Sequence, residues 1–136
     1  MHYSPVTEKV MRDLEDLVGS HSVAYERDKL QAYSHDEVGL QLWERPYCAE
    51  ALVIPESVEH VSAVLAYADN RRIPVTPRGA GTGLSGGAVP AFGGIIMSFD
   101  RMNRILEVYL ENLTITAEPG VVTSDIQAAA ARHGLE

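Results

Sequence analysis

Residues 51 to 76 carry the pattern of a strand, a helix and a second strand, and this pattern limits the possible folds more than any other feature of the chain. The run from Ala51 to Ile54 is wholly apolar, which is typical of a strand buried on both faces. Ser57 is a good helix N-cap, and apolar residues recur after it at helical spacing. A second short apolar strand follows from Ile73 to Thr76. Because a helix joins the two strands, the pattern predicts a crossover with a parallel pair of strands.

Helices and further strands are predicted on both sides of this unit. Before it we expect a helix that Ser4 caps and Gly19 ends, a weaker helix from about Tyr25 to Tyr33, and a long connection over residues 34–50. After it we expect a buried strand over residues 94–99, a hairpin of residues 105–110 and 113–117, and a last helix opened by Ser124 and Gln127 at capping-box spacing.

The segment PRGAGTGLSGGA, residues 77–88, holds five glycines directly after the second strand of the crossover. Ligands tend to bind at the carboxyl ends of parallel strands, and amides without a neighbouring Cβ can approach a phosphate closely. A P-loop needs a lysine after its last glycine, but Gly87 is followed by Ala-Val-Pro. A dinucleotide fingerprint needs a following helix, which Pro90, Gly93 and Gly94 prevent. The segment is therefore interpreted as a phosphate cradle made of its own amides, with a flexible connector as the alternative.

Charge and cysteine content exclude other classes of protein. A formal net charge of -8 argues against non-specific binding of nucleic acid. The single cysteine, Cys48, cannot form a disulfide within the chain, which favours a reducing compartment. We find no transmembrane segment and no leader, and expect a cytoplasmic location with membrane association only through partners. The five histidines lack the spacing of metal ligands, so no metal site is expected.

Three stretches in order, PVTPRGAGTGLSGGAVP, GGIIMSFDRMNRI and TAEPGV, resemble a known family. They are similar to the FAD-linked oxidases of the vanillyl-alcohol oxidase and p-cresol methylhydroxylase (PCMH) superfamily, within it to the group of glycolate oxidase and D-lactate dehydrogenase. The PCMH-type FAD-binding domain has two α+β lobes with the flavin between them. The resemblance implies that residues 46–136 form the first lobe, with a small parallel sheet and a hairpin flanked by helices. An N-terminal helical segment and connection would occupy residues 1–45.

The resemblance also implies which residues would hold the cofactor. The pyrophosphate of FAD would lie on the amides of residues 79–83, and Arg78 would contact either a phosphate or a nearby backbone carbonyl. Gly120 lies in a second stretch that approaches the flavin in relatives. No histidine lies between Pro77 and Pro90, so the FAD would be bound non-covalently. The full predicted set is Pro77, Arg78, Gly79, Ala80, Gly81, Thr82, Gly83, Ser85 and Gly120.

The activity that the resemblance implies is oxidation of a 2-hydroxy acid such as glycolate or D-lactate, with an external electron acceptor and further oxidase subunits as candidate partners. Relatives continue into a second lobe and a substrate cap, whereas this sequence stops at Glu136. We therefore expect an N-terminal fragment, natural or truncated, that has no catalytic residue, is inactive alone and does not retain FAD. Two alternatives stay open: a stand-alone module that binds an anion or a protein, and a flavoenzyme of the same superfamily that acts on a different alcohol.

Overall fold

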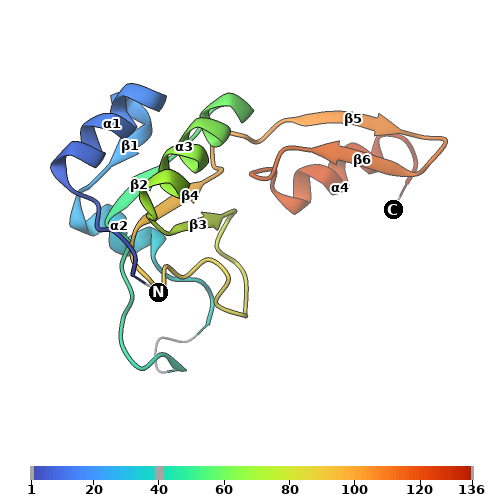
Figure 1. Cartoon of the computed structure of the whole chain (residues 1–136). Helices are drawn as coiled ribbons and strands as arrows, with labels where there is room; N and C mark the ends of the chain where they lie inside the picture. The colour runs from blue at the N-terminus through green and yellow to red at the C-terminus, as the bar shows by residue number, and fades with distance from the viewer. Residues whose placement is uncertain (1, 39–41, 136) are drawn as a thin grey trace.

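The computed structural model describes residues 2–38 and 42–135 (Figure 1). The middle of the connection predicted over residues 34–50 and the terminal Glu136 lie outside the described residues. In chain order the elements are α1 (Glu8–Val18), η1 (Ser20–Ser22), β1 (Val23–Ala24), α2 (Arg27–Tyr33), β2 (Ala51–Val53), α3 (Val58–Arg71), β3 (Val75–Arg78), β4 (Ile95–Ser98), β5 (Ile105–Tyr109), β6 (Thr114–Ala117) and α4 (Thr123–Ala131). Over these ranges no helix is long and apolar enough to span a bilayer.

The main sheet has the strand order β1-β2-β4-β3. Both β2 and β3 pair in parallel with β4, where Leu52 and Thr76 lie on either side of Ile96. The predicted crossover is confirmed, but the prediction that its two strands pair directly is wrong, because β4 lies between them. All residues of β4 are buried, and the centre of the sheet is the position that buries a strand most completely. The two-residue strand β1 pairs antiparallel with β2 and was not predicted, since two residues show no alternation.

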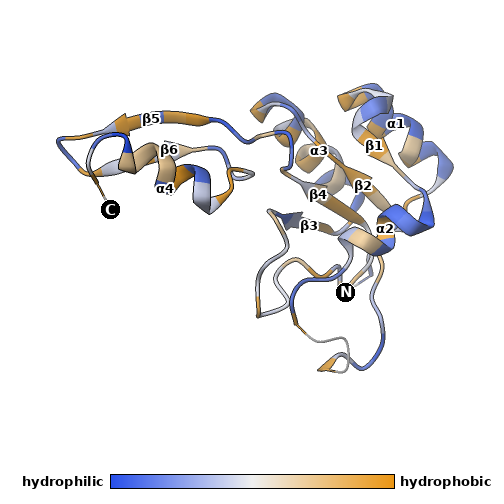
Figure 2. Ribbon diagram, turned by 180° about the vertical axis from the view of Figure 1, so that it is seen from behind, coloured by the Kyte–Doolittle hydropathy of each residue, from blue (hydrophilic) through white to orange (hydrophobic). Residues whose placement is uncertain are grey.

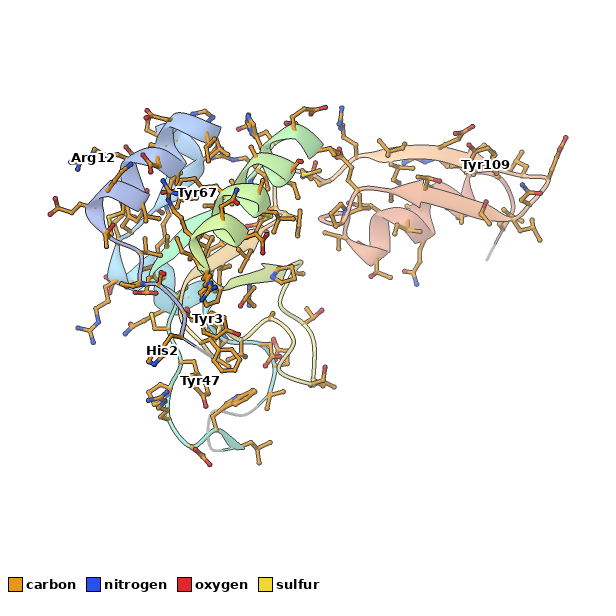
Figure 3. All side chains as sticks on the ribbon, in the orientation of Figure 1. His2, Tyr3, Arg12, Tyr47, Tyr67 and Tyr109 are labelled. Atoms are coloured by element: carbon orange, nitrogen blue, oxygen red, sulfur yellow. The ribbon has the colours of Figure 1, made fainter. Side chains whose placement is uncertain are left out.

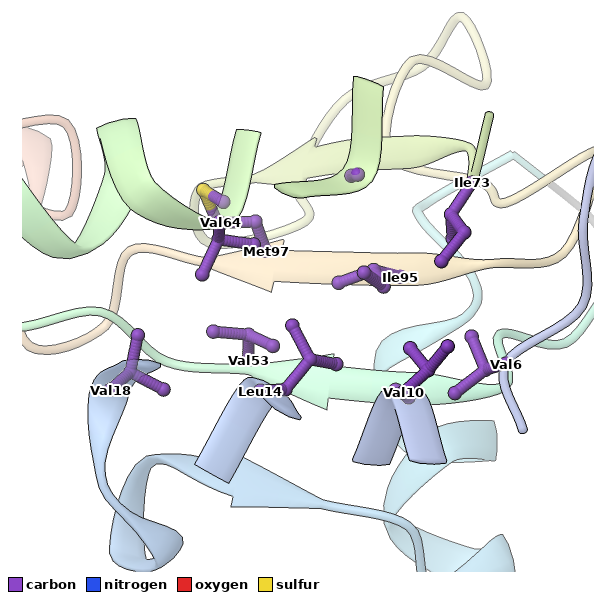
Figure 4. Packing of buried hydrophobic residues seen from close by; sticks show 11 residues of the cluster. Val6, Val10, Leu14, Val18, Val53, Val64, Ile73, Ile95 and Met97 are labelled. Carbon is purple, nitrogen blue, oxygen red and sulfur yellow. The ribbon is translucent and has the colours of Figure 1, made fainter. Parts of the chain in front are cut away.

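Helices cover both faces of this sheet. On one face, Leu14 of α1 and Val64 of α3 pack against Ile95 and Met97 of β4 (Figure 4). On the other face, α2 packs its Leu30 with residues of β2 and β4 in a second buried cluster. The sheet is therefore the middle of three layers, and Figure 2 shows β2 and β4 as apolar strands within it.

Helix boundaries differ from the prediction at two N-termini. Helix α1 begins at Glu8 and its cap is Thr7, whose Oγ1 accepts a hydrogen bond from the Val10 amide at 3.4 Å, so the prediction of Ser4 as the cap is wrong. Helix α4 already includes Ser124 in its first turn and has no side-chain cap, so the capping box is also wrong. Two predicted boundaries are confirmed: Ser57 is the N-cap of α3, and Gly19 is the C-cap of α1.

Strands β5 and β6 and helix α4 form an arm that projects from the main sheet (Figure 1). The predicted hairpin is confirmed, with Tyr109 opposite Thr114. At its base, the buried Glu118 carboxylate accepts hydrogen bonds from the Arg104 amide at 2.8 Å and from its guanidinium at 2.7 and 3.1 Å. These contacts with Arg104 lower the pKa of Glu118. The ion pair therefore holds the two ends of the hairpin together at the base of the arm.

Asp13 joins α1 to α3. Its Oδ2 accepts hydrogen bonds from the Tyr67 hydroxyl at 2.6 Å and from Arg71 at 3.4 Å, and Lys9 lies 2.9 Å away (Figure 3 labels Tyr67). The Tyr67 hydrogen bond, followed by that of Lys9, lowers the pKa of Asp13 from 3.8 to about 2. The folded chain therefore stabilises the ionised form of Asp13 more than the unfolded chain does.

We expect the free energy of unfolding to fall as the pH drops from about 4 to about 2. As the pH falls through this window, the unfolded chain takes up a proton at Asp13 before the folded chain does. The stability that ionised Asp13 contributes is therefore complete above the window and is lost within it. Asp13→Asn should lower stability at neutral pH and flatten this part of the pH dependence, as urea denaturation would measure. Asp16→Asn, which changes an exposed carboxylate on the same helix, is the control. An unchanged acid slope in Asp13→Asn would contradict the assignment.

Candidate functional site

The glycine loop, residues 79–88, leaves the carboxyl end of β3 at the edge of the sheet. Pro77 and Arg78 still belong to β3, so this strand starts and ends two residues later than the sequence suggested. The Phe99 amide donates to the Arg78 carbonyl at 3.0 Å, which ties the last residue of β3 to the chain after β4. The loop therefore begins from a fixed point.

Backbone amides of the loop form a row of unused donors. Within the part of the chain that the structure describes, none of the N–H groups of residues 79–85 donates a hydrogen bond to a protein group. Most of this stretch is exposed, and so are Thr82 and Ser85, the predicted hydroxyl donors. A mostly exposed row of unused backbone donors, with glycine at positions 79, 81 and 83, fits an anion cradle.

Arg78 points away from the exposed side of the loop. Its side chain is buried, Nη1 donates a hydrogen bond to the His35 carbonyl, and its guanidinium carbon lies 5.5 Å from the centre of the Tyr33 ring. Of the two roles left open by the sequence, the structure shows the contact with a backbone carbonyl. Arg78 fastens the end of β3 to the segment after α2.

Gly81 and Gly83 differ in what they demand of the backbone. Gly81 has a φ of +73°, and a Cβ there would meet the Arg78 guanidinium at 2.1 Å. Gly83 has no positive φ, and the nearest atom to a Cβ would be Asp36 Oδ2 at 3.9 Å. Gly81 is therefore required by the fold, whereas a side chain at Gly83 fits without strain.

The turn that contains Gly120 lies beside the start of the glycine loop. A Cβ on Gly79 would be 3.6 Å from the Pro119 carbonyl oxygen, so the structure brings together two stretches that are separate in sequence. The Gly120 amide already donates to the Met102 carbonyl at 2.8 Å. A Cβ on Gly120 would lie 2.0 Å from the Phe99 carbonyl oxygen, so packing within the chain already requires glycine here, and the N–H of Gly120 is in use.

Three residues that sequence reasoning missed hold the loop from the connection after α2. The Glu37 amide donates to the Gly83 carbonyl at 3.1 Å, and Asp36 Oδ2 accepts from the Gly86 amide at 2.9 Å. The His35 carbonyl is the acceptor for Arg78. The stretch SHDEV has no periodicity, and two of these contacts use only backbone atoms of the connection, so the sequence carries no signal for them.

Tyr33 completes this side of the loop. Its hydroxyl donates to Asp100 Oδ2 at 2.6 Å, and this hydrogen bond raises the pKa of Tyr33. The contact links the end of α2 to the chain after β4. The carboxyl edge of the sheet is thus a network of fixed polar contacts around a loop whose outer amides are unused.

A three-layer α+β sheet whose edge strand leads into such a loop defines the first-lobe architecture of a PCMH-type domain. The chain belongs to the FAD binding domain family, whose model matches residues 49–136. Two solved structures show the same fold. P-cresol methylhydroxylase with substrate bound has a TM-score of 0.78 at 23% identity, over 93% of this chain and 25% of that one. Alkyldihydroxyacetonephosphate synthase has a TM-score of 0.79 at 16% identity, over 98% of this chain and 29% of that one.

Curated relatives are more similar in sequence. Glycolate oxidase subunit GlcD of Bacillus subtilis (strain 168) is 42% identical over 63% of this chain and 18% of its own length. D-2-hydroxyglutarate dehydrogenase of Stutzerimonas stutzeri (strain A1501) is 37% identical over 90% of this chain and 26% of its own length. D-lactate dehydrogenase of Anaerostipes hadrus is 34% identical over 98% of this chain and 27% of its own length. The chain thus spans between 18% and 27% of the length of these relatives.

Proposed function

We propose that this chain is the pyrophosphate-binding part of a flavin-dependent oxidoreductase that oxidises a 2-hydroxy acid such as glycolate or D-lactate. The observation that carries the proposal is the row of unused, exposed amides over residues 79–85 in a member of the FAD binding domain family. The relatives are named for glycolate, D-2-hydroxyglutarate and D-lactate, which share a hydroxyl group next to a carboxylate.

The residues present fit a pyrophosphate. Glycine at positions 79, 81 and 83 leaves the amides of this stretch open, and neutral N–H dipoles can bind an anion although the chain is acidic. We assign the pyrophosphate to the amides of residues 79–83, with hydroxyl donors from Thr82 and Ser85 and the Gly120 turn alongside. Pro77 and Arg78 fix the start of the loop.

FAD, when bound, supplies an acceptor for the hydride of the substrate carbon. The role of this chain's own residues is to bind and orient the cofactor, and we assign no catalytic base among them. Because no histidine lies between Pro77 and Pro90, the proposed binding is non-covalent. We further propose a cytoplasmic enzyme that passes its electrons to an external acceptor, with other oxidase subunits as its candidate partners.

The experiment that tests the function is an absorption spectrum of the whole protein that the gene encodes. We expect the two-banded spectrum of an oxidised flavin, release of the flavin on acid precipitation, and anaerobic bleaching by glycolate or D-lactate but not by L-lactate. Release on precipitation follows from non-covalent binding.

Two results would contradict the proposal at different levels. A colourless protein that also fails to take up added FAD would refute the cofactor assignment and favour a stand-alone anion- or protein-binding module. A yellow protein that only a different class of alcohol bleaches would refute the 2-hydroxy acid and leave the flavin assignment intact.

A further inference from the structure

The connection after α2 contains one buried carboxylate, and this carboxylate contacts the glycine loop. Asp36 is 6% exposed. Its Oδ2 accepts from the Gly86 amide at 2.9 Å, and its Oδ1 accepts from the Val38 amide at 3.0 Å. Among the described residues no lysine, arginine or histidine forms an ion pair with it. Its two oxygens are therefore held by backbone amides from two segments far apart in the sequence.

This contact marks the end of the unused amides. The N–H groups of residues 79–85 have no protein acceptor in the described part of the chain, whereas the next one, at Gly86, is taken by Asp36. The loop thus already binds one anion, and that anion is a side chain of the same protein. A hydrogen bond to a charged acceptor is stronger than one between neutral groups, so this is the contact best able to hold the exposed loop in one shape.

The carboxylate also lies close to the proposed phosphate site. Its Oδ2 is 3.9 Å from the position that a Cβ on Gly83 would occupy. A phosphate bound at the end of the loop near Gly83 and Gly86 would come close to this carboxylate, and like charges repel where water is partly excluded. A phosphate on the loop would therefore be disfavoured near Gly86 and favoured towards Gly79.

We propose that Asp36 is the positioning residue of the glycine loop. As a built-in anion on the Gly86 amide, it holds residues 83–86 in the shape that the ligand-free protein presents. Its charge confines the pyrophosphate to the amides at the Gly79 end of the row. The second statement rests on the proposed function, whereas the first concerns the protein without any ligand.

The first test uses amide hydrogen exchange, measured by NMR on the ligand-free chain. In the wild type we expect the Gly86 amide to exchange more slowly than the amide of the exposed Gly87. Asp36→Ala should accelerate exchange at Gly86 about tenfold, since it removes the acceptor. Asp36→Asn keeps one oxygen, which can accept from Gly86 or from Val38 but not from both, so exchange at Gly86 should lie between the wild type and Asp36→Ala. Glu44→Ala, which removes an exposed carboxylate of the same connection, should change nothing.

The second test measures the dissociation constant of FAD for the whole protein carrying the same substitutions. We expect Asp36→Ala to weaken binding about tenfold through loss of loop order. Asp36→Asn should bind FAD as tightly as the wild type or more tightly, because the repulsion is gone although part of the loop order is lost. A carboxylate that acts through loop order alone would instead place the FAD affinity of Asp36→Asn between the wild type and Asp36→Ala.

The two tests separate the inference from the proposed function. If Gly86 exchange is the same in Asp36→Ala as in the wild type, the positioning role is wrong whatever binds to the loop. If exchange changes as expected but no variant binds FAD, the positioning role stands and the proposed function fails. If Asp36→Asn weakens FAD binding as much as Asp36→Ala, the confinement of the pyrophosphate by charge is overturned.

Discussion

Gly83→Val is expected to abolish FAD retention by the whole protein while it leaves the free energy of unfolding within about 0.5 kcal/mol of the wild type. Gly83 is exposed, has no positive φ, and has only Asp36 Oδ2 within 4 Å of where a Cβ would lie, at 3.9 Å. The fold therefore accepts a branched side chain at this position. A phosphate bound to these amides must approach the backbone within hydrogen-bond distance, and a branched side chain at position 83 would compete with it for space.

The matched control for this substitution is Gly87→Val. Gly87 is also exposed and has nothing within 4 Å of the place where a Cβ would lie, but it follows the Gly86 amide that Asp36 occupies. We expect this variant to keep its flavin. Gly81→Val is not a usable probe. The positive φ and the clash with the Arg78 guanidinium would destabilise the fold, so a loss of flavin could not be assigned to the cradle.

The measurement is the ratio of flavin to protein absorbance after gel filtration, paired with urea denaturation of each variant. Retention of flavin by Gly83→Val would show that the amides of this stretch do not hold the pyrophosphate. Loss of flavin from Gly87→Val would show that the site extends past Asp36.

Elements with a periodic pattern and the local pairing of the hairpin could be predicted from the sequence, whereas the strand order of the main sheet could not. The apolar run of β2 and the helical spacing of α3 indicated both elements and their parallel crossover correctly. The place of β4 between β2 and β3 depends on which strand gains most from burial on both sides. That comparison involves the whole sheet, so no local pattern contains it.

Of the candidate site, too, only a part could be predicted from the sequence. The glycine run indicated an exposed backbone, and the structure shows unused amides there. The role of Arg78 was open because a guanidinium on a loop can reach either a ligand or a carbonyl. It is decided by register: Arg78 lies opposite Ser98, on the face of the sheet that α2 covers, and so turns inward to His35. The assignment of the nine predicted residues to FAD stays a prediction.

Gly94 is the glycine on which the sheet itself depends. It is buried, it directly precedes β4, and its carbonyl accepts hydrogen bonds from the Glu50 and Ala51 amides at 2.8 and 3.2 Å. Its own amide donates to Glu50 Oε2 at 2.8 Å. A Cβ at this position would lie 2.3 Å from the Pro74 carbonyl oxygen, which is the acceptor for the Ile95 amide. The starts of β2, β3 and β4 therefore meet at this residue.

We expect Gly94→Ala to lower the free energy of unfolding by about 4 kcal/mol, since the φ of +71° is strained for alanine and the Pro74 carbonyl must move away from Ile95. Gly93→Ala is the matched control. Its φ is +70°, but the nearest neighbours of its Cβ would be atoms of the Glu50 side chain, with Oε2 at 3.3 Å, and a side chain shifts more easily than backbone, so the cost should stay at about 1–2 kcal/mol. Urea denaturation measures both values. Equal costs for the two neighbours would show that the clash with Pro74 is relieved without loss. A larger cost at Gly94 would show that the contact between the Pro74 carbonyl and the start of β4 is needed for the stability of the sheet.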